Sequence, residues 1–180
     1  GGKAGSEDAC RPLADAFRRN GTWWAPTLVI HARHRGRGQW LSAALPIYDR
    51  MTKMVHAFWD GAPLPHHGNW LRDSTPAGRH ASPSDSLGFL RFAERLDLPV
   101  LAASDMGSPN VMYMLPGFSL HTELAMMVAE GFTPLRALQS ATLNPATMLR
   151  ATDSLGTVAP GKMADLVLLD ADPLTDITNT

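Results

Sequence analysis

An aspartate ends an apolar run in the second half of the chain. Residues 99–105 read PVLAASD, and Gly107 and Pro109 then prevent a regular strand from continuing. In parallel α/β proteins, catalytic groups gather at the carboxyl ends of strands, because the loops there vary while the strands hold the geometry. A carboxylate at such an end can bind a divalent metal, or take a proton from water during hydrolysis. The alternative interpretation of Asp105 is a turn former, a common role for Asp near Gly.

Histidines supply the other candidates for a site. Residues 61–86 are rich in Gly, Pro, Ser and His and lack periodicity, which predicts a long loop. Within this loop, His66 and His67 are predicted to line or cover the substrate mouth, and they are the first substrate-binding candidates. His121 lies near the start of the helix expected after Asp105. It is predicted either to contact the substrate or to pack at the start of this helix.

Two further histidines, His31 and His34, follow the apolar stretch 22–30. This spacing could hold zinc if the segment were helical, but a solvent-facing loop is the favoured interpretation. Neither residue is therefore assigned to a metal.

Composition and charge narrow the classes of partner. The chain has 180 residues, of which 44% are hydrophobic and 18% charged, as in an ordinary globular protein. Its 16 basic and 17 acidic residues leave a formal charge of −1, so nothing favours nucleic acid or an anionic membrane, and a small-molecule or peptide substrate is expected. The single cysteine excludes an intrachain disulfide, and no run reaches the ~18 apolar residues of a membrane helix. The default compartment is the cytoplasm.

The elements that would position these residues follow an α/β order. Apolar residues recur at helical spacing in four segments, which are 6–21, 45–60, 84–98 and 119–131. Short strands are predicted at 21–25, with Pro26-Thr27 at the exit, and at 99–105. Helices that alternate with parallel strands indicate an α/β fold. The tail instead predicts two short β segments around the Pro160-Gly161 turn.

Several helix ends carry capping signals. Ser6 and Gly21 are suited to cap the first helix, and Ser119 is suited to cap the helix that closes at Gly131. Two short helices are predicted to begin at Thr133-Pro134 and Asn144-Pro145. The apolar face of the first helix is expected to contain Cys10, Leu13, Ala14 and Phe17.

Four stretches of the second half carry a resemblance to a known family. They are PVLAASD (99–105), SLHTELAMMVAEGFTPLRAL (119–138), ATLNPA (141–146) and LGTVAPGKMADLVLLD (155–170). Together they resemble the carboxyl-terminal part of metal-dependent amidohydrolases, closest to the imidazolonepropionase and prolidase-like branch. The earlier GTWWAPTL (21–28) resembles the seventh barrel strand of that family.

The resemblance implies a fold and a division into domains. Such enzymes are distorted (β/α)8 TIM barrels with a small β-sandwich built from both chain ends. Residues 1–150 would then be the last strands and helices of the barrel, and residues 151–180 part of the sandwich. The family's first-strand His-x-His pair, its bridging lysine or glutamate and its later histidine ligands have no counterparts in this sequence. They are expected in an amino-terminal part of the barrel that precedes residue 1.

The resemblance also implies an activity. One or two divalent metals, usually zinc, activate a water in such enzymes. Asp105 matches the acidic residue at the end of the eighth strand, which can contact the metal and takes the proton of the attacking water. The expected function is metal-dependent hydrolysis of amide-like C–N bonds in cyclic amides or dipeptides, with the isolated segment inactive. The alternative is a non-catalytic fragment or interaction module that self-associates into a homo-oligomer through open strand edges.

Overall fold

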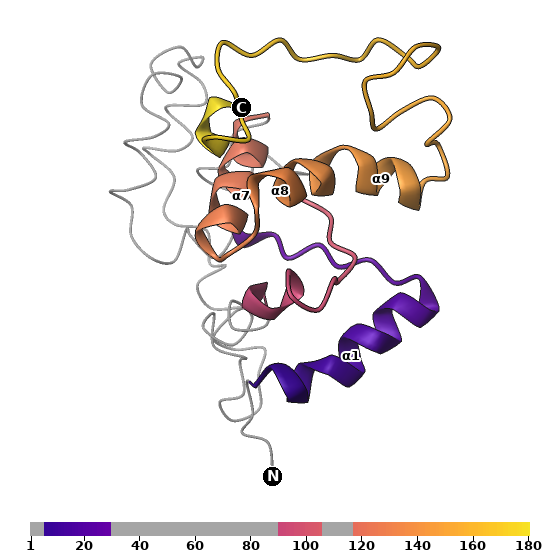
Figure 1. The fold of residues 1–180 in the computed structure, drawn as a ribbon, viewed down its shortest axis with the longest axis vertical. Helices are drawn as coiled ribbons and strands as arrows, with labels where there is room; N and C mark the ends of the chain where they lie inside the picture. The colour runs from indigo at the N-terminus through magenta and orange to yellow at the C-terminus, as the bar shows by residue number, and fades with distance from the viewer. Residues whose placement is uncertain (1–5, 30–89, 106–116) are drawn as a thin grey trace, which may run out of the picture.

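Helices surround two short segments that lie side by side (Figure 1). The structure is a computed structural model that describes residues 6–29, 90–105 and 117–180. Its named elements, in chain order, are α1 (Glu7–Asn20), α7 (Phe118–Ala129), α8 (Pro134–Ala141), α9 (Leu143–Met148) and the 3-10 helix η2 (Ile177–Asn179). None of the described helices combines the length and the apolar character needed to cross a membrane. The helix predicted at 45–60 lies outside the described residues.

The first helix forms as its end signals predict. The Ala9 N–H donates to the Ser6 hydroxyl oxygen (3.3 Å), and Gly21 ends α1 in the left-handed conformation with φ +60°. Ala14 is fully buried, with Cys10 and Phe17 packed against the core beside it. The prediction for Leu13 is wrong, because this side chain is 48% exposed. Residues 10, 14 and 17 form a narrow stripe at helical spacing, and Leu13 lies at its edge.

The two predicted strands pair in parallel at one point. The Trp24 N–H donates to the Pro99 carbonyl, and the Leu101 N–H donates to the Trp24 carbonyl, with N···O distances of 2.9 Å each. These two hydrogen bonds form a parallel bridge between Trp24 and Val100. Within the described residues no longer ladder forms, and Pro26 has no N–H with which to continue one. The parallel pairing expected of an α/β fold is thus limited to one bridge in the described residues.

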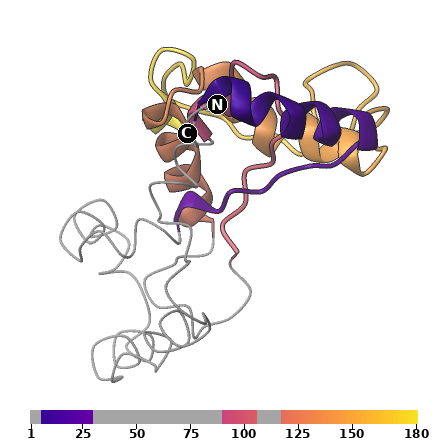
Figure 2. The same cartoon turned by 90° about the horizontal axis from the view of Figure 1, so that it is seen from below.

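The opposite edge of the segment around Val100 is covered by the junction of α8 and α9. The Asn144 side-chain amide donates to the Val100 carbonyl (2.8 Å), and the Ala102 N–H donates to the Ser140 carbonyl (2.9 Å). Asn144 was expected to cap a helix, but α9 already begins at Leu143 and Asn144 stabilises the strand segment instead. The two paired segments lie between α1 on one side and α8 and α9 on the other, and α1 lies in front of these helices in Figure 2.

Helices α7 and α8 add Leu124, Met127 and Ala137 to the core. The N-cap of α7 is Gly117 with φ +80°, and Ser119 is a buried first-turn residue rather than the cap that its sequence position predicts. The left-handed entry, which glycine adopts without strain, moves the helix start two residues upstream. Thr133 and Pro134 begin α8 as predicted, with the Arg136 N–H donating to the Thr133 hydroxyl (3.3 Å). The larger fully buried apolar side chains are Leu28, Val29, Leu90, Leu98, Val100 and Met127.

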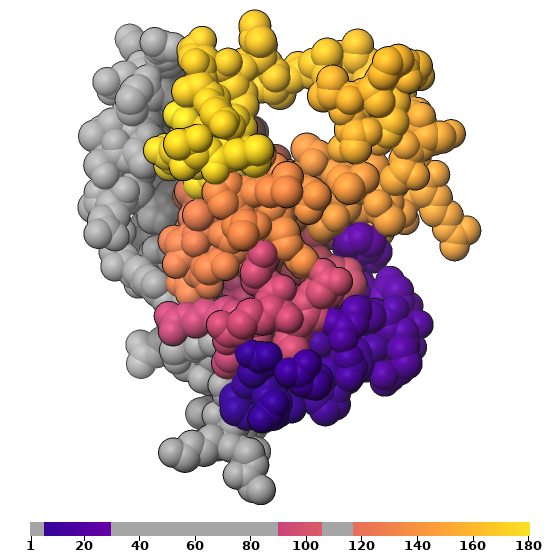
Figure 3. Space-filling view, in the orientation of Figure 1, coloured from indigo at the N-terminus to yellow at the C-terminus, as the bar shows by residue number. Residues whose placement is uncertain are grey.

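The carboxyl-terminal stretch lies mostly away from this core. Residues 163–169 run in an open, extended path in Figure 1, but the two predicted β segments around Pro160-Gly161 do not form a ladder in the described part of the chain. A strand requires a partner for its backbone, and a two-stranded hairpin alone is marginal in water. Val167 is 80% exposed and Leu168 fully exposed. Figure 3 shows an opening between this segment and the helices below it.

Candidate functional site

Asp105 lies where the second paired segment ends. Its side chain is exposed and its backbone is left-handed, with φ +52°. No hydrogen bond or ion pair joins its carboxylate to another described residue. Since a left-handed conformation is uncommon for residues other than glycine and more frequent for Asp, it fits both a strand-exit carboxylate and a turn former. The carboxylate is therefore accessible to a ligand.

The first paired segment ends in a similar way. Thr27 has φ +47°, and the chain is helical at residues 28–29 directly after it. A left-handed conformation is a genuine outlier for a β-branched residue, so the backbone at this exit is strained. Because Trp24 pairs in parallel with Val100, Thr27, three residues beyond Trp24, and Asp105, five residues beyond Val100, both follow the bridge toward the carboxyl ends of the paired segments.

A buried glutamate holds the exit at Thr27. Glu123 on α7 has no exposed surface, and its two carboxylate oxygens accept from the Leu28 N–H (2.9 Å) and the Val29 N–H (2.8 Å). Burial raises the pKa of Glu123 to about 7, although both backbone hydrogen bonds act to lower it. The helix that follows Asp105 in the sequence thus binds the backbone at the exit of the neighbouring segment.

Sequence reasoning did not identify Glu123 as a functional candidate. A signal was present, because Glu123 lies at helical spacing with Leu120, Leu124 and Met127 on the face that packs inward. A carboxylate on such a face requires hydrogen-bond partners to offset its desolvation. The partners themselves lie about a hundred positions upstream, so no local pattern could name them.

Of the predicted histidines, His121 is the one that lies within the described residues. His121 lies on the exposed side of α7, with its ring 6.3 Å from the ring of Phe118 at a tilt of 57°. His66, His67, His31 and His34 all lie outside the described residues. Their roles remain predictions.

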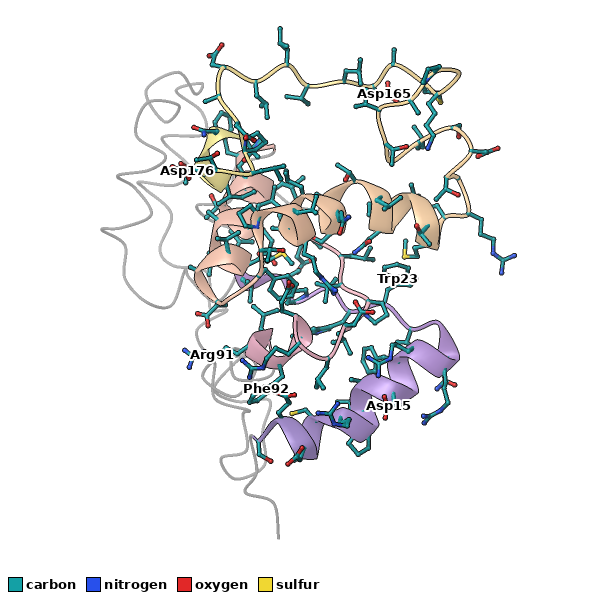
Figure 4. All side chains as sticks on the ribbon, in the orientation of Figure 1. Asp15, Trp23, Arg91, Phe92, Asp165 and Asp176 are labelled. Carbon is teal, nitrogen blue, oxygen red and sulfur yellow. The ribbon has the colours of Figure 1, made fainter. Side chains whose placement is uncertain are left out.

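Charged groups fix the entry to the segment that ends at Asp105. Arg136 on α8 forms ion pairs with Glu94 (3.2 Å) and Asp97, and it donates to the Leu98 carbonyl (3.1 Å). Side chains from α1, α7, α8 and residues 90–105 meet in the core, whereas Asp165 lies on the loop at the top of Figure 4, away from them. Together with Asn144, Arg136 holds this segment from the side of α8 and α9.

The described residues contain no group of three or more potential metal ligands. A catalytic zinc takes about three protein ligands, and Asp105 offers one oxygen ligand. The described residues therefore do not form such a site by themselves.

Comparison with known proteins gives a consistent family. A sequence model described as the amidohydrolase family matches residues 38–180. An adenine deaminase of Lysinibacillus sphaericus (strain C3-41) is 50% identical over 52 residues, which are 29% of this chain and 9% of that protein. An imidazolonepropionase of Pyrobaculum arsenaticum is 43% identical over 76 residues, or 42% of this chain and 18% of the relative.

A solved structure supports the same fold. The crystal structure of a Xaa-Pro dipeptidase with methionine bound in its active site matches with a TM-score of 0.57 and 22% identity, over 93% of this chain and 33% of that one. The family and this neighbour imply a TIM-barrel-type fold, of which the described residues show the single parallel bridge and its helices. The matched region is a small part of each of these larger proteins. The resemblance noted in the sequence is confirmed, and the chain belongs to the amidohydrolase family.

Proposed function

We propose that the chain is the carboxyl-terminal portion of a metal-dependent hydrolase that cleaves amide-like C–N bonds in small molecules. The observation that carries the proposal is the accessible carboxylate of Asp105 at the end of a segment paired in parallel with its neighbour. This is the position at which barrel enzymes place catalytic groups. The division into a partial barrel at residues 1–150 and part of a β-sandwich at residues 151–180 belongs to the same proposal.

In this proposal Asp105 is both a metal ligand and the proton acceptor. Its carboxylate takes the proton of the attacking water and delivers it to the leaving nitrogen as the C–N bond breaks. One or two divalent metals, of which zinc is the expected one, would activate the water and polarise the bond under attack. The remaining ligands would come from the amino-terminal part of the barrel.

The relatives suggest the classes of substrate. Their names specify adenine, an imidazolone and Xaa-Pro dipeptides, which all present a C–N bond to hydrolysis. We propose a cyclic amide or a dipeptide for this chain, with His66, His67 and His121 contacting the substrate. A cytoplasmic location completes the proposal.

The first prediction concerns metal content. The 180-residue chain, purified and dialysed against zinc at a micromolar concentration, is expected to hold much less than one zinc per chain by elemental analysis. A single carboxylate supplies one of about three ligands that a catalytic zinc needs. The longer polypeptide with the amino-terminal barrel strands should hold at least one equivalent, and it should hydrolyse one of adenine, an imidazolonepropionate or a Xaa-Pro dipeptide.

Two outcomes would contradict this. Stoichiometric zinc in the 180-residue chain, lost in His31→Ala or His66→Ala, would reveal a site of its own. A longer polypeptide that binds zinc but hydrolyses none of the three compounds would remove the assigned substrate class.

A second candidate function is self-association. It is favoured by the extended residues 163–169, where Val167 and Leu168 expose most of their surface. Exposed apolar side chains on an unpaired extended segment provide an edge for a second copy. The edge near Val100 offers less to such a partner, because Asn144 and Ser140 already occupy it.

The second prediction follows from that surface. The chain is expected to sediment as a dimer or larger at micromolar concentration, and Val167→Lys should shift it toward the monomer because a charge is placed on the apolar edge. Asp165→Lys, which changes charge in the same segment without removing an apolar side chain, is the matched control and should remain associated. A wild-type chain that sediments as a monomer would contradict this candidate function.

A further inference from the structure

Glu123 joins two parts of the chain that meet at the proposed site. It lies on α7, the described helix that follows Asp105 in the sequence, and binds the backbone where the neighbouring segment ends, at Leu28 and Val29. Its side chain has no exposed surface, so these contacts are made without competition from water. A surface role for this carboxylate is excluded.

The two donors match a carboxylate closely. Leu28 and Val29 are successive residues whose N–H groups point at different oxygens of one side chain, at 2.9 and 2.8 Å. A carboxylate offers two acceptor oxygens, whereas an amide offers one acceptor and an NH₂ group that would oppose an N–H. The geometry therefore favours Glu over Gln at this position. A side chain that only filled space would not need these two hydrogen bonds.

The bound backbone directly follows a strained residue. Thr27 is left-handed at φ +47°, a conformation that a β-branched residue adopts only when the surroundings impose it. With both following N–H groups held by Glu123, the turn cannot relax without losing two buried hydrogen bonds. The carboxylate thus provides the restraint that the conformation of Thr27 requires.

We infer that Glu123 is a positioning residue, which holds the exit turn at Thr27 so that the chain leaves the first paired segment in a fixed direction beside the exit that carries Asp105. The inference rests on the proposed function for its catalytic consequence only. The clamp itself is a property of this chain and can be measured without turnover.

Hydrogen exchange tests the clamp directly in the 180-residue chain. Glu123→Gln is expected to raise the exchange rates of the Leu28 and Val29 amides about 10-fold or more, while amides in the middle of α8 change little. Glu130→Gln at the C-cap of α7 is the matched control, because Glu130 pairs with exposed Arg91 at 3.3 Å and no hydrogen bond joins it to either amide. Unchanged exchange at Leu28 and Val29, or an equal rise throughout α7 and α8, would overturn the inference.

Thr27→Gly separates the clamp from general core stability. Glycine adopts φ near +47° without strain, so the turn should depend less on Glu123 in this background. The fall in melting temperature caused by Glu123→Gln is expected to be smaller in Thr27→Gly than in wild type. If Glu123→Gln alone does not fold, the double variant should fold. Failure of both, or an equal fall in both backgrounds, would assign Glu123 to the core rather than to the turn.

Kinetics of the completed enzyme test the catalytic consequence. Glu123→Gln is expected to lower kcat by about 10- to 100-fold with a smaller change in KM, because a small misplacement of groups at the site slows the reaction. Thr27→Gly should restore part of that loss, which general destabilisation would not explain. If Asp105→Asn leaves turnover unchanged, the proposed function fails. The exchange experiment would still show whether Glu123 holds the Leu28 and Val29 amides. Wild-type kcat in Glu123→Gln would remove its positioning role.

Discussion

Asp105→Asn is expected to lower kcat by about 10²- to 10⁴-fold in the metal-loaded, completed enzyme, which is the usual contribution of general acid–base catalysis. Asn keeps the shape of the side chain and one oxygen ligand, but it has no basic site to accept the proton of water. KM should change little, because the lost interaction is made in the transition state. Steady-state kinetics at saturating metal measure the effect.

A matched control lies at the other end of the same segment. Asp97 is also left-handed, with φ +49°, and it forms an ion pair with Arg136 instead of facing a proposed site. Asp97→Asn should therefore leave kcat within a few-fold of wild type. If Asp105 were only a turn former, Asp105→Asn would behave in the same way, because Asn also tolerates this conformation and serves in turns. A wild-type kcat in Asp105→Asn would thus exclude Asp105 from the mechanism.

Local signals in the sequence predicted the helix ends best. The caps at Ser6, Gly21 and Thr133 are confirmed, because each depends on a hydrogen bond or a backbone conformation within a few residues. Asn144 followed the same logic and was predicted wrongly. Its amide has a partner 44 positions away, at Val100, which local capping preference does not take into account.

The strands were harder to predict than the helices for a similar reason. An apolar run identifies a segment that is suited to pair, and the parallel bridge at Trp24 shows that the first two such segments do so. The number of paired residues depends on what lies beside each edge. The described tail at 163–169 has the composition of a strand and remains extended without a ladder, because composition cannot supply a partner.

Glu123 shows how much of a site can be read from sequence. Its place among the apolar positions of α7 was a signal that the sequence analysis missed, and that signal carries no information on what the carboxylate binds. Asp105, by contrast, could be named from its position after an apolar run and from the resemblance. The order of the elements located the candidate catalytic group, while the contacts that support it required the structure.

The loop after α9 packs on the start of that helix, from which Asn144 binds the strand segment at Val100. Ala151 N–H donates to the Ala146 carbonyl (2.8 Å), which brings residues 151–156 back over the start of α9, where Asn144 binds Val100. Gly156 lies at the closest approach. A Cβ built on it would be 2.7 Å from the Cβ of Ala146, 3.1 Å from a backbone carbon of Leu143 and 3.2 Å from a backbone oxygen.

Gly156→Ala is accordingly expected to destabilise the protein by about 2–4 kcal/mol, from the cost of a left-handed alanine together with overpacking against backbone atoms that cannot move aside. Its φ is +87°. Gly161→Ala is the matched control, since φ there is +85° but a Cβ meets nothing within 4 Å, so it should cost only about 1–2 kcal/mol. Urea unfolding of both variants in the same polypeptide gives the difference, which isolates the packing contribution. Equal losses would show that the loop yields at Gly156, and that α9 and Asn144 hold the strand segment without its support.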